Sequence, residues 1–213
     1  MRIVLIHATR VAMDPVERAF AALWPQAETV SILDEGLSSD LAAGRVTRRA
    51  LDARINALAD YAMGMAPDAI LYTCSSFGTG IEQAARRLPI PVLKPNEAMF
   101  DEAIAAGGRV VMLYTFGPAA EGMAREYRDA CGQDLTCVHA PGAIEALKAG
   151  DAATHDRLLA EAVAGIEADT VMLAHFSMAG AAPGLRTLTT ATLLTSPDAA
   201  VRRLQTLLKD KTC

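Results

Sequence analysis

The chain has 213 residues and a formal net charge of −5; 52% of the residues are hydrophobic, although only 5% are aromatic. This length allows one large domain or two small lobes with a substantial core. The acidic balance gives no basis for binding nucleic acid or an anionic membrane surface, and no apolar run approaches the ~20 residues of a transmembrane helix.

The cysteines are spread along the chain without the spacing of a metal site or a disulfide framework. They are Cys74, Cys131, Cys137 and Cys213, with no CxxC pair and no cluster of His and Cys. The chain begins with a charged residue, Arg2, and a short apolar run, as a secretion signal does. A helix-favouring segment follows from Asp14, however, where the cleavage site of a signal would lie. We therefore expect a cytoplasmic protein without a metal site.

The first half of the chain alternates apolar strands with amphipathic helices. Strands are predicted at 2–7, 29–33 and 91–93, and helices at 15–24, at 46–65 and after 95. Asn96 is the predicted cap of that third helix. Residues 34–40 are predicted to form a polar loop long enough to reach over a site.

One stretch of the first half, residues 68–80, carries the strongest functional signal. An apolar run ends at Cys74, and Ser75, Ser76 and a glycine-rich turn follow. This order predicts a buried strand, a tight turn and a helix start, so Cys74 should lie at the carboxyl edge of a sheet, where open α/β proteins bind ligands. Free N–H groups at a helix start bind anions and favour a thiolate. The alternative is a buried structural cysteine.

The second half of the chain repeats the first. Residues 109–115 have the character of residues 2–8, and residues 169–175 match residues 68–74 at an offset of 175 − 74 = 101. Further strands are predicted at 135–139 and 191–194. Helices are predicted from 117 to about 130 and as a pair within 142–168. A last helix is predicted at 197–208, with Ser196 as its cap, and we expect this helix to pack on the first half of the chain.

These repeats predict an α/β fold of two pseudo-symmetric lobes, each a parallel sheet flanked by helices, with the active site in the cleft between them. We expect residues 1–95 plus a C-terminal helix at about 196–213 to form the first lobe. Residues 96–195 are expected to form the second lobe.

Equivalent strand ends of the two halves carry Cys74 and His175, which should face each other across one cleft. Two proton-handling groups on opposite sides of a small substrate suit the addition and removal of a proton at one carbon. Ser177 follows His175 as Ser76 follows Cys74. His7 and Thr9 end the first strand, so they either line the same mouth or are ordinary loop residues.

The chain resembles the aspartate/glutamate/hydantoin racemase superfamily, which also contains arylmalonate decarboxylases and maleate isomerases that need no cofactor. The segments that carry the resemblance are Asp34 to Leu41, Tyr72-Thr-Cys-Ser-Ser76, Lys94-Pro-Asn-Glu-Ala98, the strand end at Thr115, and Val171 to Ala179. The resemblance implies that Cys74 is an acid/base without a cofactor. It also implies that Ser75, Ser76 and backbone amides hold a substrate carboxylate, with Thr115 as the second half's counterpart.

The chain departs from the two-base racemases of this superfamily because it lacks their second cysteine. His175 stands either at that position or, in an offset alignment, at the histidine that follows it in glutamate racemases. His175 could be the opposite base, since its unperturbed pKa of ~6.5 suits proton transfer near neutrality. It could equally bind substrate in an enzyme that protonates from one face only. A Cys–His hydrolase would also place an imidazole opposite the thiol.

We therefore expect a racemase or epimerase that acts on a small carboxylate or related compound, such as an amino acid or a hydantoin. The alternatives are a one-sided decarboxylase, a cis–trans isomerase of a small dicarboxylate, and a non-catalytic small-acid binding protein. The only expected partner is the small-molecule substrate, although the sequence also allows a homo-oligomer.

Overall fold

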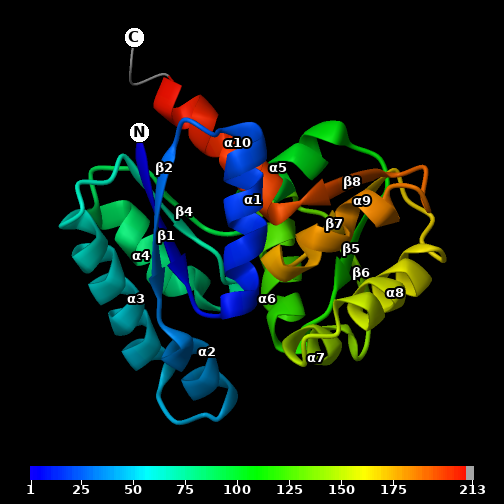
Figure 1. The fold of residues 1–213 in the computed structure, drawn as a ribbon, viewed down its shortest axis with the longest axis horizontal. Helices are drawn as coiled ribbons and strands as arrows, with labels where there is room; N and C mark the ends of the chain where they lie inside the picture. The colour runs from blue at the N-terminus through cyan, green and yellow to red at the C-terminus, as the bar shows by residue number, and fades with distance from the viewer. Residues whose placement is uncertain (210–213) are drawn as a thin grey trace.

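Two lobes, each built on a parallel four-stranded sheet, make up the computed structural model, which describes residues 1–209 (Figure 1). The strand order is β2-β1-β3-β4 in the first lobe and β6-β5-β7-β8 in the second. The strands are β1 (Arg2–His7), β2 (Glu28–Leu33), β3 (Ala69–Tyr72), β4 (Val92–Leu93), β5 (Val110–Tyr114), β6 (Thr136–His139), β7 (Thr170–Leu173) and β8 (Thr192–Thr195). The predicted α/β fold with two similar lobes is confirmed.

Helices connect successive strands in both lobes. The α-helices are α1 (Met13–Leu23), α2 (Glu35–Ala42), α3 (Arg48–Met63), α4 (Gly78–Arg87), α5 (Glu97–Ala106), α6 (Gly117–Cys131), α7 (Ala143–Lys148), α8 (Ala152–Val163), α9 (Ala182–Leu185) and α10 (Ser196–Lys209). Short 3₁₀ helices are η1 (Arg10–Ala12), η2 (Ser75–Phe77) and η3 (Phe176–Ala181). Within residues 1–209, no helix is both long enough and apolar enough to span a bilayer.

The first sheet is covered on both faces, which explains why its central strands are continuous apolar runs. On β1, Ile3 and Leu5 pack with α1 and α10, whereas Val4 and Ile6 pack with α3 and α4. All four side chains are buried. Polar side chains can therefore reach a shared space only where the strands end.

The two lobes repeat a hydrogen bond at the start of their central strands. The Arg2 N–H donates to Asp68 Oδ2 at 2.7 Å, and the Arg109 N–H donates to Asp169 Oδ2 at 2.6 Å. Gly108 precedes the second pair with φ +74°, and a Cβ built on it would lie 2.5 Å from Asp169 Oδ2. Only glycine combines this backbone conformation with so close a carboxylate.

The far ends of the central strands repeat as well. The Thr73 N–H donates to the Ile6 carbonyl, and the Ala174 N–H donates to the Leu113 carbonyl, both at 3.0 Å. The chain therefore leaves the ends of β3 and β7 in the same way. The residues that follow Thr73 and Ala174 are Cys74 and His175, the two predicted acid/base candidates.

The segment predicted as a loop at 34–40 is a helix, so that part of the prediction is wrong. Residues Glu35–Ala42 form α2, and its Leu37 is buried beneath the helix in the cluster that covers the first sheet. Leu37 and Leu41 lie four residues apart, which places both on one helix face. Of the polar residues between them, Ser39 is exposed, whereas Ser38 lines the cavity described below.

Asn96 and Ser196 do not cap helices as predicted. Neither helix start is capped by these side chains; instead Ser196 Oγ donates to Asn96 Oδ1 at 2.9 Å. At the start of α10, the Thr195 hydroxyl accepts from the Asp198 N–H at 3.3 Å. Asn96 and Ser196 are both buried, so their pairing with each other satisfies polar groups that solvent cannot reach.

The helix α10 packs on the first lobe, as predicted. Its Val201 and Leu204 share a buried cluster with Val16 and Phe20 of α1 and with Leu5 of β1, and Figure 1 shows α10 beside α1. The predicted extension of this helix to 213 lies partly outside the described residues, as does Cys213.

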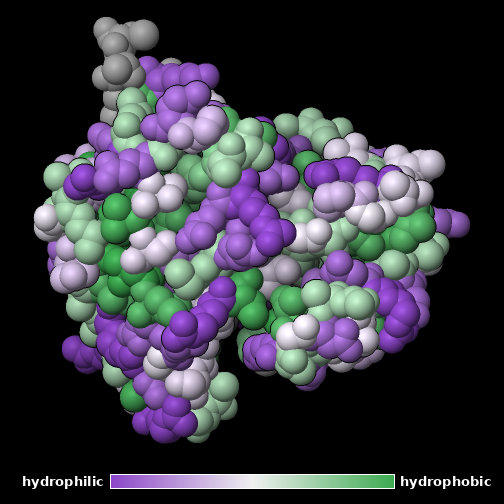
Figure 2. Space-filling view, in the orientation of Figure 1, coloured by the Kyte–Doolittle hydropathy of each residue, from purple (hydrophilic) through white to green (hydrophobic). Residues whose placement is uncertain are grey.

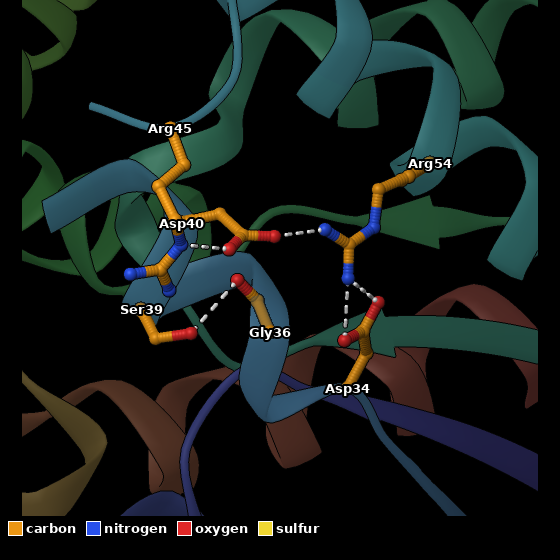
Figure 3. A network of polar contacts seen from close by, with 6 residues as sticks. All are labelled: Asp34, Gly36, Ser39, Asp40, Arg45 and Arg54. Atoms are coloured by element: carbon orange, nitrogen blue, oxygen red, sulfur yellow. Dashed lines mark hydrogen bonds and ion pairs between the residues drawn. The ribbon is translucent and has the colours of Figure 1, made fainter. Parts of the chain in front are cut away.

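Ion pairs fasten both ends of α2 to α3 (Figure 3). Arg54 of α3 contacts Asp34 at 2.6 Å and Asp40 at 2.6 Å, and Arg45 contacts Asp40 at 2.8 Å. Hydrogen bonds from Arg45 and Arg54 hold the pKa of Asp40 below its ordinary value. Arg54 therefore acts as the main link between the two helices.

We predict that Arg54→Met loosens α2 without unfolding the lobe. These ion pairs are partly buried but close to the surface, where such pairs contribute little to global stability, so the melting temperature should change by only a few degrees. Backbone amides of α2 should exchange with solvent several-fold faster by hydrogen–deuterium exchange, because a segment held by few contacts opens locally. Arg49→Met, on the same helix, is the matched control, and unchanged exchange in α2 would contradict the prediction.

Candidate active site

A cavity of about 410 Å³ lies between the lobes and takes its walls from both. In Figure 2 the surface is hollowed at the lower edge, between the α2 and α7 regions. The lining residues are Thr9, Val11, Ala12, Ser38, Leu41, Ala42, Arg48, Thr73, Cys74, Ser75, Ser76, Pro95, Asn96, Phe116, Ile144, Lys148, Ala174, His175, Phe176 and Ser177. This volume suits a small-molecule ligand.

Cys74 and His175 lie in this one cavity at equivalent positions of the two lobes. Each residue is extended, with φ −123° and ψ 122° at Cys74 and φ −115° and ψ 143° at His175. Each immediately precedes a 3₁₀ helix, η2 or η3. The repeated topology therefore brings the two residues to one space, although 101 positions separate them in the sequence.

Most of the predicted site residues line the cavity, and two do not. Those that line it are Thr9, Cys74, Ser75, Ser76, His175 and Ser177. His7 and Thr115 lie outside its lining and are buried at the ends of β1 and β5. The Thr115 hydroxyl is buried without a hydrogen-bond partner among the described residues.

His7 is a buried support rather than a lining residue. Its Nδ1 lies 2.9 Å from Thr73 Oγ1, and its Nε2 lies 3.2 Å from Ser31 Oγ. Burial lowers the pKa of His7 to about 4, so its imidazole is neutral near pH 7. The side chain sits between neighbouring strands, and it positions Thr73, which does line the cavity.

The Cys74 thiol is held in its protonated form by its surroundings. Burial raises the pKa of Cys74, and hydrogen bonding from the Ser76 backbone N–H and from the Ser76 and Ser38 hydroxyls offsets only part of that effect. The expected preference for thiolate at this helix start is therefore reversed in the free protein. The Ser76 backbone N–H, which was expected to bind a substrate carboxylate, donates a hydrogen bond to the Cys74 sulfur instead.

His175 has one ring nitrogen already engaged. The Phe116 backbone N–H donates to His175 Nε2 at 3.2 Å. Burial lowers the pKa of His175 to about 4, so the ring is neutral near pH 7. A neutral imidazole that accepts at Nε2 carries its proton on Nδ1, and this ring therefore offers a donor, not a second acceptor.

Two cations at the cavity were not predicted from the sequence. Arg48 Nη1 donates to the Ser76 carbonyl at 2.6 Å, and Lys148 Nζ lies 5.9 Å from the centroid of the Phe116 ring. Both side chains belong to exposed residues that line the cavity. Neither belongs to a motif, since their positions depend on how α3 and α7 pack.

The lining contains no acidic side chain within the part of the chain that the structure describes. Residues 1–209 also hold no group of three or more His, Cys, Asp or Glu placed to bind a metal ion. The polar groups that the cavity presents are therefore hydroxyls, amides, one thiol, one imidazole and two cations. Such a set favours an anionic ligand.

Several solved structures share this fold at low sequence identity. An allantoin racemase from Pseudomonas fluorescens is 20% identical with a TM-score of 0.73, covering 98% of this chain and 91% of its own. A glutamate racemase from Bacillus anthracis is 14% identical with a TM-score of 0.76, covering 98% and 82%. The aspartate racemase of Picrophilus torridus is 14% identical with a TM-score of 0.72, covering 94% and 91%.

A comparison with curated proteins finds no matching sequence. The family described as Asp/Glu/Hydantoin racemase, in contrast, matches residues 3–204, which is nearly the whole chain. The cavity with its strand-end cysteine lies entirely inside the matched residues. The chain therefore belongs to the Asp/Glu/hydantoin racemase family, and racemases are isomerases.

Proposed function

We propose that the cavity binds a small carboxylate and that Cys74 moves a proton at its α-carbon, in a racemase-type reaction that needs no cofactor. The observation that carries the proposal is the position of Cys74. It follows the central strand β3 of the first lobe and lines a cavity that His175, at the equivalent position of the second lobe, lines as well, in a chain of the racemase family. The family membership supports a racemase-type reaction on an amino acid or a hydantoin.

The chemistry is one proton transfer and its reverse. Cys74 first releases its own proton to solvent, since the free protein holds it as a thiol. The thiolate then takes the proton of the α-carbon as the C–H bond breaks, and the electron pair of that bond moves into the carboxyl group to give an enediolate. The enediolate then takes a proton back at the carbon. Hydroxyls of Ser75 and Ser76 and the Nδ1–H of His175 lie in the same cavity, and such donors stabilise the developing oxyanion.

His175 is the proposed group on the opposite face of the substrate. To act as the second acid/base, its ring would have to release the Phe116 N–H or exchange the proton on Nδ1. Its low pKa also makes the imidazolium form scarce near pH 7. These features leave Cys74 as the better supported of the two proton-handling groups.

The engaged Nε2 of His175 favours a second candidate, a one-sided reaction with Cys74 as the only proton donor. In this reaction the bond between the α-carbon and a second carboxylate breaks, CO₂ leaves, and the electron pair stays as an enediolate. The Cys74 thiol gives its proton to that carbon, and solvent restores the thiol. The raised pKa of Cys74 suits a group that begins as a proton donor.

We also keep the cytoplasm as the proposed compartment. Cys74, Cys131 and Cys137 are free thiols, which supports a reducing environment.

We predict that Cys74→Ala lowers solvent-proton exchange at the substrate α-carbon by at least about 10²-fold, the usual contribution of a positioned acid or base. Exchange would be measured by NMR in deuterated water over amino acids, hydantoins and malonates. Cys137→Ala removes a thiol of β6 that does not line the cavity and is the matched control. Full exchange in Cys74→Ala would contradict the proposal.

Two substitutions at His175 separate its roles. Glutamine keeps both an acceptor for the Phe116 N–H and a donor for the substrate, so His175→Gln should stay within about tenfold of the wild type if His175 is a donor, and His175→Leu should lose about 10²-fold or more. If His175 is instead the second base, both variants should stop interconversion equally. Exchange of one enantiomer would then persist, because Cys74 still serves its own face.

We predict that Cys74 is alkylated slowly by iodoacetamide at pH 7. Its raised pKa means a smaller thiolate fraction than an ordinary thiol has at the same pH, so the rate should reach half its maximum above pH ~8.5. A variant with Cys131, Cys137 and Cys213 changed to Ser isolates this thiol. A midpoint below pH 7 would show that the hydrogen bonds outweigh burial.

A further inference from the structure

We propose that Lys94 and Glu126 are positioning residues, which clamp the two lobes together so that Cys74 and His175 keep their relative places in the cavity. Their ion pair joins the end of β4 in the first lobe to α6 in the second. This role rests on the proposed function, since it concerns the same two proton-handling groups, but the clamp itself can be tested without a substrate.

Lys94 is a partly buried cation between two carboxylates. Its Nζ lies 2.5 Å from Glu126 Oε1 and 2.9 Å from Glu82 Oε1. The side chains of Lys94 and Glu126 are 17% and 26% exposed, whereas that of Glu82 is 44% exposed. Burial alone would lower the pKa of Lys94, but hydrogen bonds and the charges of Glu126 and Glu82 raise it above its ordinary value. The pair with Glu126 is the less screened of the two, because water and salt reach it less.

Glu126 places this ion pair next to the turn that carries Cys74. The helix α6 packs against η2, the turn that begins directly after Cys74. A Cβ built on Gly78, the first residue of α4, would lie 3.6 Å from Glu126 Oε1, so the carboxylate lies against the N-terminal end of that helix. A negative charge is favourable there. Glu126 therefore contacts two parts of the first lobe, the Lys94 ammonium and the start of α4.

The same helix leads back to His175. The helix α6 begins at Gly117, and the residue before it, Phe116, donates its N–H to His175 Nε2. Glu126 follows Phe116 by 126 − 116 = 10 positions, which is about 15 Å along an α-helix. One rigid element therefore holds His175 at its start and contacts the turn after Cys74 further along. An anchor at Glu126 fixes the distance between the two groups.

Lys94 itself lies where the chain crosses from the first lobe to the second. It follows β4, and its backbone N–H donates to Oε1 of Glu97, the first residue of α5, at 3.3 Å. The next two residues, Pro95 and Asn96, line the cavity. A displacement of Lys94 would therefore move a wall of the cavity together with α6.

Alkylation of Cys74 by iodoacetamide tests the clamp without a substrate. In the variant that keeps only this thiol, Lys94→Met and Glu126→Gln should each raise the alkylation rate at pH 7 several-fold, because a loosened turn opens locally and admits solvent to the thiol. The melting temperature should fall by no more than a few degrees, which separates local opening from unfolding. Wild-type rates in both variants would overturn the inference.

Glu82→Gln is the matched control, because it removes the more exposed carboxylate of the same ammonium group and leaves the contact between the lobes. It should keep the rate within about twofold of the wild type. The double variant of Lys94→Met and Glu126→Gln should react no faster than the faster single variant, because both changes break one contact. Additive effects, or an effect of Glu82→Gln as large as that of Glu126→Gln, would show that Lys94 does not act through α6.

The same variants keep this inference distinct from the proposed function. On a compound that the wild type exchanges, they should lower kcat more than they raise KM, because the substrate still binds while the two groups are displaced. Faster alkylation in the variants, without α-carbon exchange by the wild type, would support the clamp and count against proton transfer. Exchange that requires Cys74 but is unchanged in Lys94→Met and Glu126→Gln would support the proposed function and overturn the positioning role.

Discussion

Burial of the strand ends is the constraint on which the chemistry of this cavity depends. It raises the pKa of Cys74 and lowers the pKa of His175 and of His7. Each shift disfavours the charged form, so the free protein holds a neutral thiol and neutral imidazoles. The strong local charges belong instead to Arg48 and Lys148 on exposed positions. A bound anion would therefore bring the negative charge that the protein itself does not keep inside.

The sequence predicts the fold well because both sheets are parallel and buried. Residues 68–74 and 169–175 each contain a short apolar run that ends at Cys74 or His175, a pattern typical of a strand covered on both faces. Their repetition predicts two equivalent strand ends, and the structure places Cys74 and His175 in one cavity. Local pattern was sufficient here because burial, rather than a particular contact, determines these segments.

The sequence predicts less where a residue's partner is distant in the chain. Asn96 and Ser196 each have the local pattern of a helix cap, but they bond to each other across 100 positions. His7 ends a strand as a lining residue would, yet its ring turns toward neighbouring strands. Arg48 and Lys148 carry no local signal at all. Their place at the cavity is decided by tertiary packing, which single-sequence patterns do not encode.

The two halves of the site have the same backbone conformation but differ in their hydrogen-bond partners. Cys74 and His175 have similar backbone angles at the ends of equivalent strands, but their partners come from different places. The sulfur receives the N–H of Ser76, two residues further on in the same turn, whereas the imidazole receives the N–H of Phe116 from the end of the neighbouring strand. The first arrangement supports a group that gains negative charge, and the second fixes a neutral donor. The repeated fold thus supplies two matched positions, and their different local donors support the proposed proton transfer at Cys74 and the proposed oxyanion binding at His175.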